Sequence, residues 1–297
     1  MDGIPNPKSG TMKLPVLILE STTPIGRAAV QAALDSGRPV IAASADATEL
    51  RELGDAYADL DLTILPGDFA TGQAAESLVA AIGALDRPLG GVIVAGACEP
   101  PRGRVIDEPA KALRHALERD LLPQLTAARA LIPLLADARR NGTYLVLGGP
   151  GADHPWAGYG HRSVAAAALQ MLVRVLHDEA RPQGVRVQML TADKPARTEA
   201  NEEHACAHWP TAMAIATQAM ALIDQVPTQR VPEPIVRFPL PTPASLPDRR
   251  AIHARRPPSG AARSTTHVHD PTPAAAPTGD DAGALLRSLL PSDNEKA

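Results

Sequence analysis

The chain has 297 residues, of which 44% are apolar and 2% aromatic, and its formal net charge is −4. Its length allows one large domain or two small ones, and its apolar content is ample for a core of ordinary size. The small negative charge gives no electrostatic reason to expect nucleic acid or an acidic membrane as a partner.

The cysteines indicate a reducing compartment, and the hydropathy indicates that no segment spans a membrane. Two isolated cysteines, Cys98 and Cys206, do not make a disulfide framework. Residues 1–13 are polar and include prolines and a glycine, so we expect a disordered tail there and no signal peptide. No run reaches the roughly 18 apolar residues of a membrane span. The sequence therefore predicts a cytoplasmic protein without a membrane segment.

Short apolar runs alternate with helical patterns from Leu14 to about Val226. The apolar runs are β-branched or aliphatic with little polar alternation, as in strands buried on both faces: Val16–Leu19, Val40–Ala43, Leu60–Leu65, Gly91–Ala95, Thr143–Leu147 and Val185–Leu190. The helical patterns between them are Ile25–Ser36, Ala47–Ala56, Gln73–Leu85, Ala110–Arg139 and Arg162–Ala180. This alternation predicts a Rossmann-type α/β domain over residues 14–240, a doubly wound parallel sheet with helices on both faces.

Residues at the predicted boundaries agree with these elements. Thr23 followed by Pro24 is a typical N-cap and first-turn proline. Gly37 is a C-terminal stop for the first helix, and Gly184 ends the long helix before the sixth strand.

The composition changes after Val226, where prolines crowd together. Ile235–Phe238 is compatible with one short edge strand. We expect residues 241–297, rich in Pro, Ala and Arg, to be disordered because they cannot bury enough apolar surface. A short helix at 281–290 would have one leucine face and could dock on a protein partner. The arginines of this tail have no interleaved aromatics, so nucleic acid is not expected.

Four segments together resemble the short-chain dehydrogenase/reductase family, over about Leu14 to Ala200. They are the turn Ile18-Leu19-Glu20-Ser21-Thr22-Thr23-Pro24-Ile25-Gly26-Arg27-Ala28, then Val94-Ala95-Gly96-Ala97, then Leu145-Val146-Leu147-Gly148-Gly149, and finally Pro182–Gln188 with Asp193–Glu199. The last of these is similar to the family's sixth strand and the loop that ends in threonine, here Thr198. The resemblance implies an NAD(P)-binding oxidoreductase fold.

The resemblance also implies which residues would contact NAD(P). These are Ser21, Thr22, Thr23, Ile25, Gly26, Ser44, Asp68, Ala95 and Gly96. The family's three turn glycines fall on Glu20, Pro24 and Gly26, so only the packing glycine remains. Pro24 removes an N–H, and a Glu20 carboxylate would repel a diphosphate if it faced the site. NAD(P) is therefore a possible cofactor and none is certain.

The family's tyrosine–lysine pair has no full counterpart. One register of the long helix places the tyrosine position on Arg162 and the lysine position on Ala166. A shift of about one turn uses Tyr159 and places the lysine position on Ser163. Neither register supplies a lysine, and none occurs from Ala112 to Asp193.

Two further family residues are also replaced. The serine that polarises the carbonyl falls near Gly148 or Gly149, and the relay asparagine falls near Asp120. The remaining candidate catalytic residues are Tyr159, Arg162 and Lys194, all expected near the carboxyl ends of the fifth and sixth strands.

Three hypotheses remain open. The main hypothesis is a catalytically inactive binding, regulatory or accessory subunit, and the alternative is an NAD(P)-dependent oxidoreductase with an altered active site. In the third, the tail from Pro241 to Ala297 captures a partner and the domain serves as its platform. The resemblance implies a homo-oligomer or a hetero-oligomer with a related subunit, through the apolar residues from Val164 to Leu176. The set His204, Cys206 and His208 is too tightly spaced to close a metal site alone, so no metal is predicted.

Overall fold

The computed structural model describes residues 13–96, 102–138, 142–226 and 232–239. They belong to one compact unit within Met1–Thr242. The expectations for residues 1–12 and for the tail from residue 240 onward, including the helix at 281–290 and its partner, lie outside the described residues.

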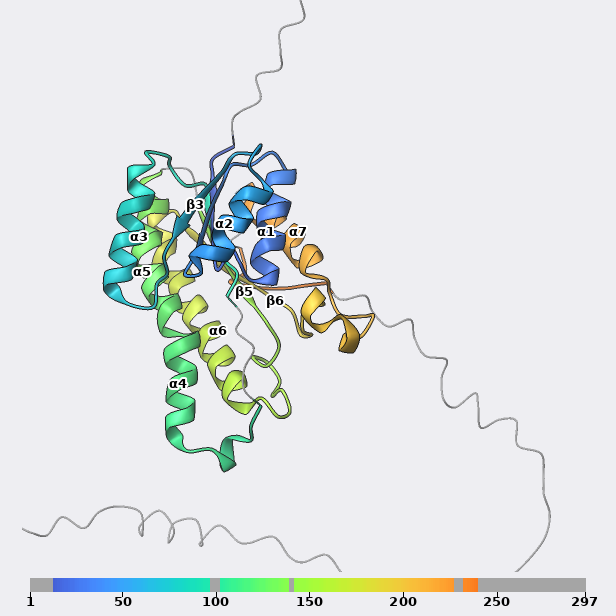
Figure 1. Cartoon of the computed structure of the whole chain (residues 1–297). Coiled ribbons are helices and arrows are strands. Elements are labelled where there is room, and N and C mark those ends of the chain that lie inside the picture. Colours follow the sequence, from blue (N-terminus) through green and yellow to red (C-terminus); the bar gives the residue numbers. More distant parts are fainter. Residues whose placement is uncertain (1–12, 97–101, 139–141, 227–231, 240–297) are drawn as a thin grey trace, which may run out of the picture. The chain divides into compact units, whose positions relative to one another are not determined.

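A seven-stranded sheet forms the centre of the domain (Figure 1). Its strands are β1 (Val16–Leu19), β2 (Val40–Ser44), β3 (Leu62–Pro66), β4 (Gly91–Val94), β5 (Thr143–Gly148), β6 (Arg186–Thr191) and β7 (Ile235–Arg237). Their order is β3-β2-β1-β4-β5-β6-β7, and every pair is parallel. The predicted doubly wound parallel sheet is confirmed, and the order reverses between β1 and β4.

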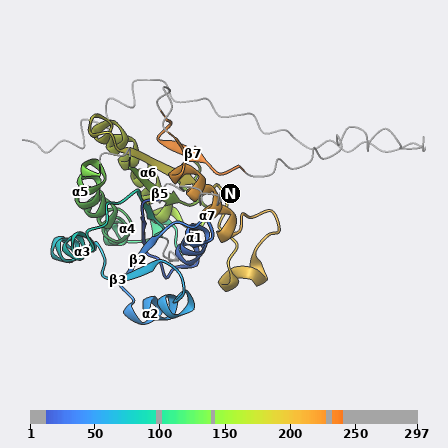
Figure 2. The ribbon, with the colours of Figure 1, turned by 90° about the horizontal axis from the view of Figure 1, so that it is seen from above.

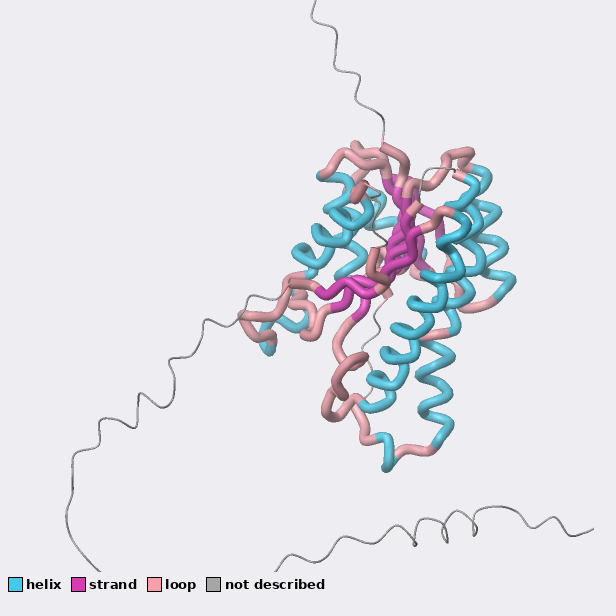
Figure 3. Tube along the Cα trace, turned by 180° about the vertical axis from the view of Figure 1, so that it is seen from behind, coloured by secondary structure: helices cyan, strands magenta, loops and turns pink. Residues whose placement is uncertain are grey.

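Helices cover both faces of the sheet, as Figures 2 and 3 show. One face carries α1 (Pro24–Asp35), α2 (Ala47–Ala56) and α7 (Ala212–Ile223). The other carries α3 (Gly72–Ala84), α4 (Ala110–Asp120), α5 (Leu122–Asp137) and α6 (Gly160–Ala180). Short 3-10 turns are η1 (Val105–Asp107), η2 (Arg181–Gln183) and η3 (Glu199–His204). Two apolar clusters fill the layers, and β1, β2 and β4 are buried throughout.

The predicted helix boundaries are largely confirmed. Thr23 caps α1 by accepting from the Gly26 N–H, and Pro24 is its first residue. Gly37 has φ +67° after α1 and Gly184 has φ +75° after η2, so both glycines adopt the left-handed conformation expected of a helix stop.

Two helix predictions were wrong. The stretch predicted as one helix over Ala110–Arg139 is broken at Leu121, which separates α4 from α5. Pro123 explains the break, because it has no N–H to continue the hydrogen bonds of α4 into the next turn. Helix α7 was not predicted. It is apolar on most sides, so its helical periodicity is weak in the sequence.

Helix α4 and the first half of α6 extend together past the carboxyl ends of the strands (Figure 1). They form one wall beside the edge of the sheet at which β1, β4, β5 and β6 end. The polar and glycine residues that follow those strands are therefore gathered against α6.

Candidate functional site

The carboxyl edge of the sheet holds two adjoining cavities. The larger, here called the reaction cavity, measures about 230 Å³ and is lined by Thr23, Gly96, Gly149, Arg162 and Thr198, among others. The smaller, the inner cavity, measures about 80 Å³ and lies between the β4 and β5 ends and helices α4, α5 and α6. Ligands of open parallel sheets bind at this edge, beside the point where the strand order reverses.

The N-terminus of α1 forms one side of the reaction cavity. The Thr23 hydroxyl accepts from the Gly26 N–H at 3.1 Å and donates to the Glu20 carbonyl at 2.8 Å. Pro24 has no N–H, so Ile25 supplies the first one of the helix. Gly26 is buried, and a Cβ there would overlap the Glu20 carbonyl oxygen and lie 2.8 Å from the Ser21 Cα. The predicted packing role of Gly26 is confirmed.

Glu20 takes the backbone conformation for which the family uses glycine. Its φ is +54°, in the left-handed region. Its side chain lines a separate cavity of about 220 Å³ with Asp68 and Gln124, here called the carboxyl cavity, and does not line the reaction cavity. Burial, and then the nearby Asp68 carboxylate, raise the pKa of the Glu20 carboxyl. The Glu20 carboxyl therefore belongs to the carboxyl cavity rather than to the reaction cavity beside the N-terminus of α1.

The hydroxyl groups next to this turn are already hydrogen bonded. The Ser21 hydroxyl is buried and donates to the Ala43 carbonyl at 3.1 Å. The Thr22 and Ser44 hydroxyls share a hydrogen bond of 2.8 Å. Asp68 accepts from the Ala70 N–H at 2.9 Å. A ligand would therefore meet Ser21 through its main chain, and would meet Ser44 only beside Thr22.

The structure distinguishes between the two registers of α6. Arg162 lines both the reaction cavity and the inner cavity, and Ala166 lines the inner cavity one turn later. Tyr159 lines neither of them. It lies just before α6, where its hydroxyl accepts from Arg102 Nε at 2.6 Å. Of the two candidates, Arg162 therefore reaches the reaction cavity and Tyr159 does not.

Gly149 lies beside the guanidinium of Arg162. A Cβ on Gly149 would lie 3.1 Å from Arg162 Nη2, a tighter distance than most Cβ contacts allow. A serine at this position would crowd the guanidinium. The resemblance puts the family's serine near Gly149 and, in one register, its tyrosine on Arg162, so these two replacements would be neighbours in space.

Gln124 was missed by the sequence reasoning. Its Oε1 is buried and has no hydrogen-bond partner within the described part of the chain. Gln124 lines both the inner cavity and the carboxyl cavity, and its Nε2 would lie 3.3 Å from a Cβ on Gly96. The signal in the sequence was weak, since a single glutamine directly after Pro123 is unremarkable at a helix start.

The predicted catalytic residues are brought close together but not into one cavity. Lys194, which follows β6, lines the reaction cavity together with Arg162. It also lines a much larger outer cavity, which contains Tyr159. Thr198 borders the reaction cavity and is the N-cap of η3. The Thr198 N–H donates to the side-chain oxygen of Asn201 at 2.9 Å.

The residues present fit the nicotinamide half of an NAD(P) molecule. Gly96 and Gly149 leave the cavity floor without side chains, and Thr23 and Ile25 place a helix N-terminus beside it, which favours a phosphate. At the adenosine half, Ser44 is neutral and bonded to Thr22, so no charged side chain at that position selects NAD or NADP. Ala95 is buried directly before Gly96.

Two further features concern metal ions and membranes. The described residues contain no group of three or more His, Cys, Asp or Glu side chains placed to hold a metal ion. None of their helices is long and apolar enough to cross a membrane.

Together, the parallel sheet and the cleft beside its switch point define a Rossmann-type α/β fold. The sequence model described as Enoyl-(Acyl carrier protein) reductase matches residues 21–228. The chain belongs to the short-chain dehydrogenase/reductase family. No curated protein sequence matches it.

Solved structures of this family share the fold. A short-chain dehydrogenase from Streptomyces avermitilis has a TM-score of 0.64 and 20% identity, covering 76% of this chain and 87% of its own. One from Mycobacterium ulcerans has a TM-score of 0.65 and 17% identity, covering 71% and 83%. A Pseudomonas aeruginosa short chain oxidoreductase, bound to NADPH and described as containing an atypical catalytic center, has a TM-score of 0.64 and 17% identity, covering 71% and 91%.

Proposed function

We propose that the chain is an NAD(P)-dependent oxidoreductase with an altered reaction centre, in which Arg162 stands in place of the tyrosine of its relatives. The observation that carries the proposal is the position of Arg162. It lines the reaction cavity against Gly149, with Lys194 on the same cavity. The NADPH-bound oxidoreductase from Pseudomonas aeruginosa, whose catalytic center is described as atypical, supports retention of the cofactor cleft on this fold.

Arginine changes the chemistry that the site can perform. A guanidinium stays protonated at all ordinary pH values, so Arg162 cannot trade a proton as a phenol does. It can hold a substrate oxygen and stabilise negative charge that develops there. Such a group suits reduction of a carbon–carbon double bond conjugated to a carbonyl, because the carbonyl oxygen gains charge without needing a proton from the protein.

The other residues of the cavity would bind and orient. The bound nicotinamide would supply the hydride to the substrate carbon. Thr23 and the Ile25 N–H would meet the cofactor's phosphate at the start of α1. Gly96 and Gly149 would let flat groups approach the main chain, and Lys194 would add a second cation beside the substrate. The proton for the substrate carbon would come from water, since this cavity is open to solvent.

The test compares NADPH oxidation with conjugated enones and with simple ketones. We expect turnover of the enones, and a loss of about 100-fold in kcat in Arg162→Gln, the usual effect of removing one donor that stabilises a developing oxyanion. Cofactor affinity should change little. Arg174→Gln, an exposed arginine on the same helix, is the matched control and should retain turnover.

The absence of tyrosine, lysine and serine from their family positions supports a second function. In it the chain is an inactive binding, regulatory or accessory subunit, joined to copies of itself or to a related chain. The same assay separates the two, because this function predicts no NADPH oxidation with any carbonyl substrate by folded protein.

A further inference from the structure

The outer cavity holds an unusual share of the chain's aromatic residues. It measures about 1050 Å³, at the upper end of ordinary ligand sites, which run from about 300 to 1,000 Å³. The chain contains only two tryptophans and three tyrosines. Both tryptophans, Trp156 and Trp209, and one tyrosine, Tyr159, line this space, here called the aromatic cavity.

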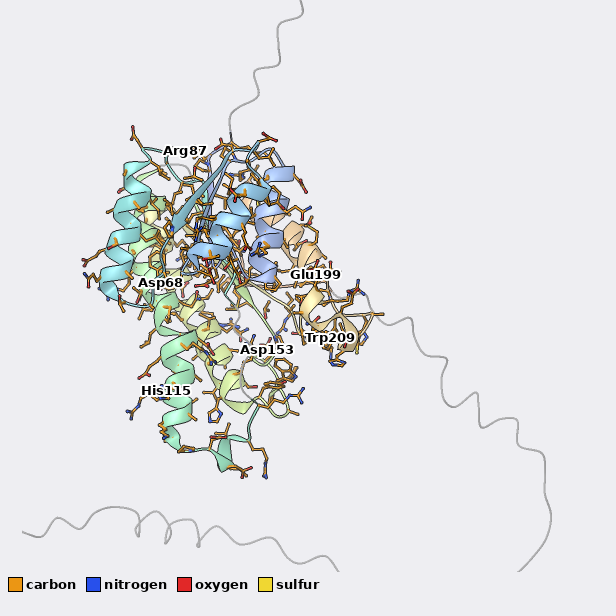
Figure 4. The ribbon with its side chains drawn as sticks, viewed as in Figure 1. Asp68, Arg87, His115, Asp153, Glu199 and Trp209 are labelled. Atoms are coloured by element: carbon orange, nitrogen blue, oxygen red, sulfur yellow. The ribbon has the colours of Figure 1, made fainter. Side chains whose placement is uncertain are left out.

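Two segments far apart in the sequence form the walls of the aromatic cavity. One is the loop between β5 and α6, with Asp153 and Trp156, and the other follows β6 and includes η3, with Lys194 and Trp209. Figure 4 labels Asp153 and Trp209 on these two segments. Asp68 in the same view belongs to the separate carboxyl cavity. Because Lys194 also lines the reaction cavity, the two spaces adjoin.

Two cationic groups flank the aromatic rings of the first wall: Arg162 comes from α6, and Arg102 comes from the segment between β4 and α4. The Trp156 and Tyr159 rings are stacked, with their centroids 4.2 Å apart. The Arg102 guanidinium lies 5.6 Å from the Tyr159 centroid, and that of Arg162 lies 5.9 Å from the Trp156 centroid. The two guanidinium groups cover the outer faces of this stack, so Trp156 and Tyr159 present their ring edges to the cavity. Ring edges favour an aromatic partner, because edge-to-face ring contacts add to simple burial.

Two carboxylates and two Lys or Arg side chains line the aromatic cavity, but in the part of the chain that the structure describes only the carboxylates have an ion-pair partner. That partner is Arg237 of β7, whose Nη1 lies 2.8 Å from Asp153 Oδ2 and 3.3 Å from Asp193 Oδ1. Burial opposes ionisation of Asp153, but hydrogen bonds from Gln170 and Arg237 hold the pKa of its carboxyl below the ordinary value. Within the described residues, Lys194 and Arg102 form no ion pair, and the hydrogen-bond partner of Arg102 is the neutral Tyr159.

We propose that the aromatic cavity binds a flat aromatic or conjugated molecule that carries a carboxylate. The ring lies against the edges of Trp156 and Tyr159, and the carboxylate is held by Lys194 and Arg102. If the proposed function holds, this is the substrate class of the reductase, since an extended conjugated acid reaches from this cavity to Arg162. Binding of the acid itself depends only on the cavity.

The experiment uses 2-naphthoate with two matched probes, measured by calorimetry on the full chain at about pH 8, where ordinary histidines are neutral. 2-Naphthamide keeps the rings and removes the charge, and decahydro-2-naphthoate keeps the charge and removes the flat rings. We expect 2-naphthoate to bind about tenfold more tightly than either. Each titration is run without and with NADPH, so that a requirement for cofactor is detected.

Two sets of variants locate the binding. The double variant Arg102→Gln with Lys194→Gln should remove the preference for naphthoate over naphthamide. Lys111→Gln with Arg114→Gln, two exposed cations on α4, is the matched control and should keep it. Trp156→Phe and Trp209→Phe each leave a single tryptophan, and the remaining fluorescence should change on naphthoate binding in both.

Equal affinity for the amide or for the saturated acid would overturn the proposal, as would no naphthoate binding with or without NADPH. An unchanged preference in the Arg102 and Lys194 double variant would overturn it too. Naphthoate binding by a chain that neither binds nor oxidises NADPH would leave this inference standing and refute the oxidoreductase. The two proposals therefore fail separately.

Discussion

Gly26 allows the main chain of Glu20 and Ser21, which follows β1, to pass close to the first turn of α1. A methyl group at this position would overlap the Glu20 carbonyl and press on the Ser21 main chain, where no flexible side chain can move aside. We expect Gly26→Ala to destabilise the fold by about 1–3 kcal/mol, the usual range for overpacking. Gly83→Ala in α3 is the control, because a Cβ there meets nothing within 4 Å. It should stabilise by about 0.5–1 kcal/mol. Urea unfolding measures both, and equal effects would contradict the packing role of Gly26.

Glu20 should make stability depend on pH. Its pKa is raised in the folded protein by burial and by Asp68, so the folded chain holds this proton more tightly than the unfolded chain. Stability then falls as pH rises past the ordinary value of a glutamate, because the unfolded chain loses the proton first.

Glu20→Gln should remove this part of the pH dependence. The difference in unfolding free energy between variant and parent should grow in favour of the variant from about pH 4 to pH 7. Thermal or urea unfolding across this range measures it, with the exposed Glu52→Gln as control. A difference that is flat with pH, or that reverses, would show that the Glu20 carboxyl is not held protonated by its surroundings.

At the level of elements, the sequence was informative where residues have strong local preferences. Thr23, Pro24 and Gly37 define α1 because capping and left-handed turns depend on a few side chains. The break between α4 and α5 was missed, although Pro123 signals it, because apolar spacing continues on both sides. Helix α7 was missed because its exposed side carries Ala214, Thr217 and Ala221 rather than charged residues, so its periodicity is weak in the sequence.

Helices α5 and α6 also carry an exposed apolar surface, which we propose as the site of self-association. Val164, Met171 and Val175 share one face of α6 and are 43%, 60% and 44% exposed, and Leu122 and Leu125 of α5 are 49% and 36% exposed. Surface of this kind on neighbouring helices marks an interface more often than a solvated face. Met171→Glu with Val175→Glu should therefore yield monomers in sedimentation experiments.

Leu60→Glu is the control for this prediction. Leu60 is 49% exposed but lies between α2 and β3, away from the α5 and α6 surface. It should leave the oligomeric state unchanged. A parent chain that is monomeric at all concentrations would refute the proposed interface.

For the whole molecule, the fold was predictable and the site only in part. Strand and helix runs in order are enough to indicate a doubly wound sheet. The register of α6 could not be chosen from sequence, because Tyr159 and Arg162 lie one turn apart and either suits a helix start. The structure separates the two residues by the cavities that they line, since Arg162 lines the reaction cavity and Tyr159 lines the aromatic cavity. The aromatic cavity could not be predicted from the sequence either, because only the folding of the loops after β5 and β6 brings Trp156 and Trp209 to the same cavity.

We propose that the cleft beside the N-terminus of α1 still binds a nicotinamide dinucleotide and that Arg162 replaces the family's tyrosine. Calorimetric titration of the purified chain with NADPH and with NADH tests it most directly. We predict saturable binding of one cofactor per chain with a Kd below about 1 mM, equivalent to at least about 4 kcal/mol of binding free energy. Binding should be retained in Arg162→Gln. No heat and no thermal stabilisation by either cofactor at millimolar concentration, with the chain folded, would contradict the account.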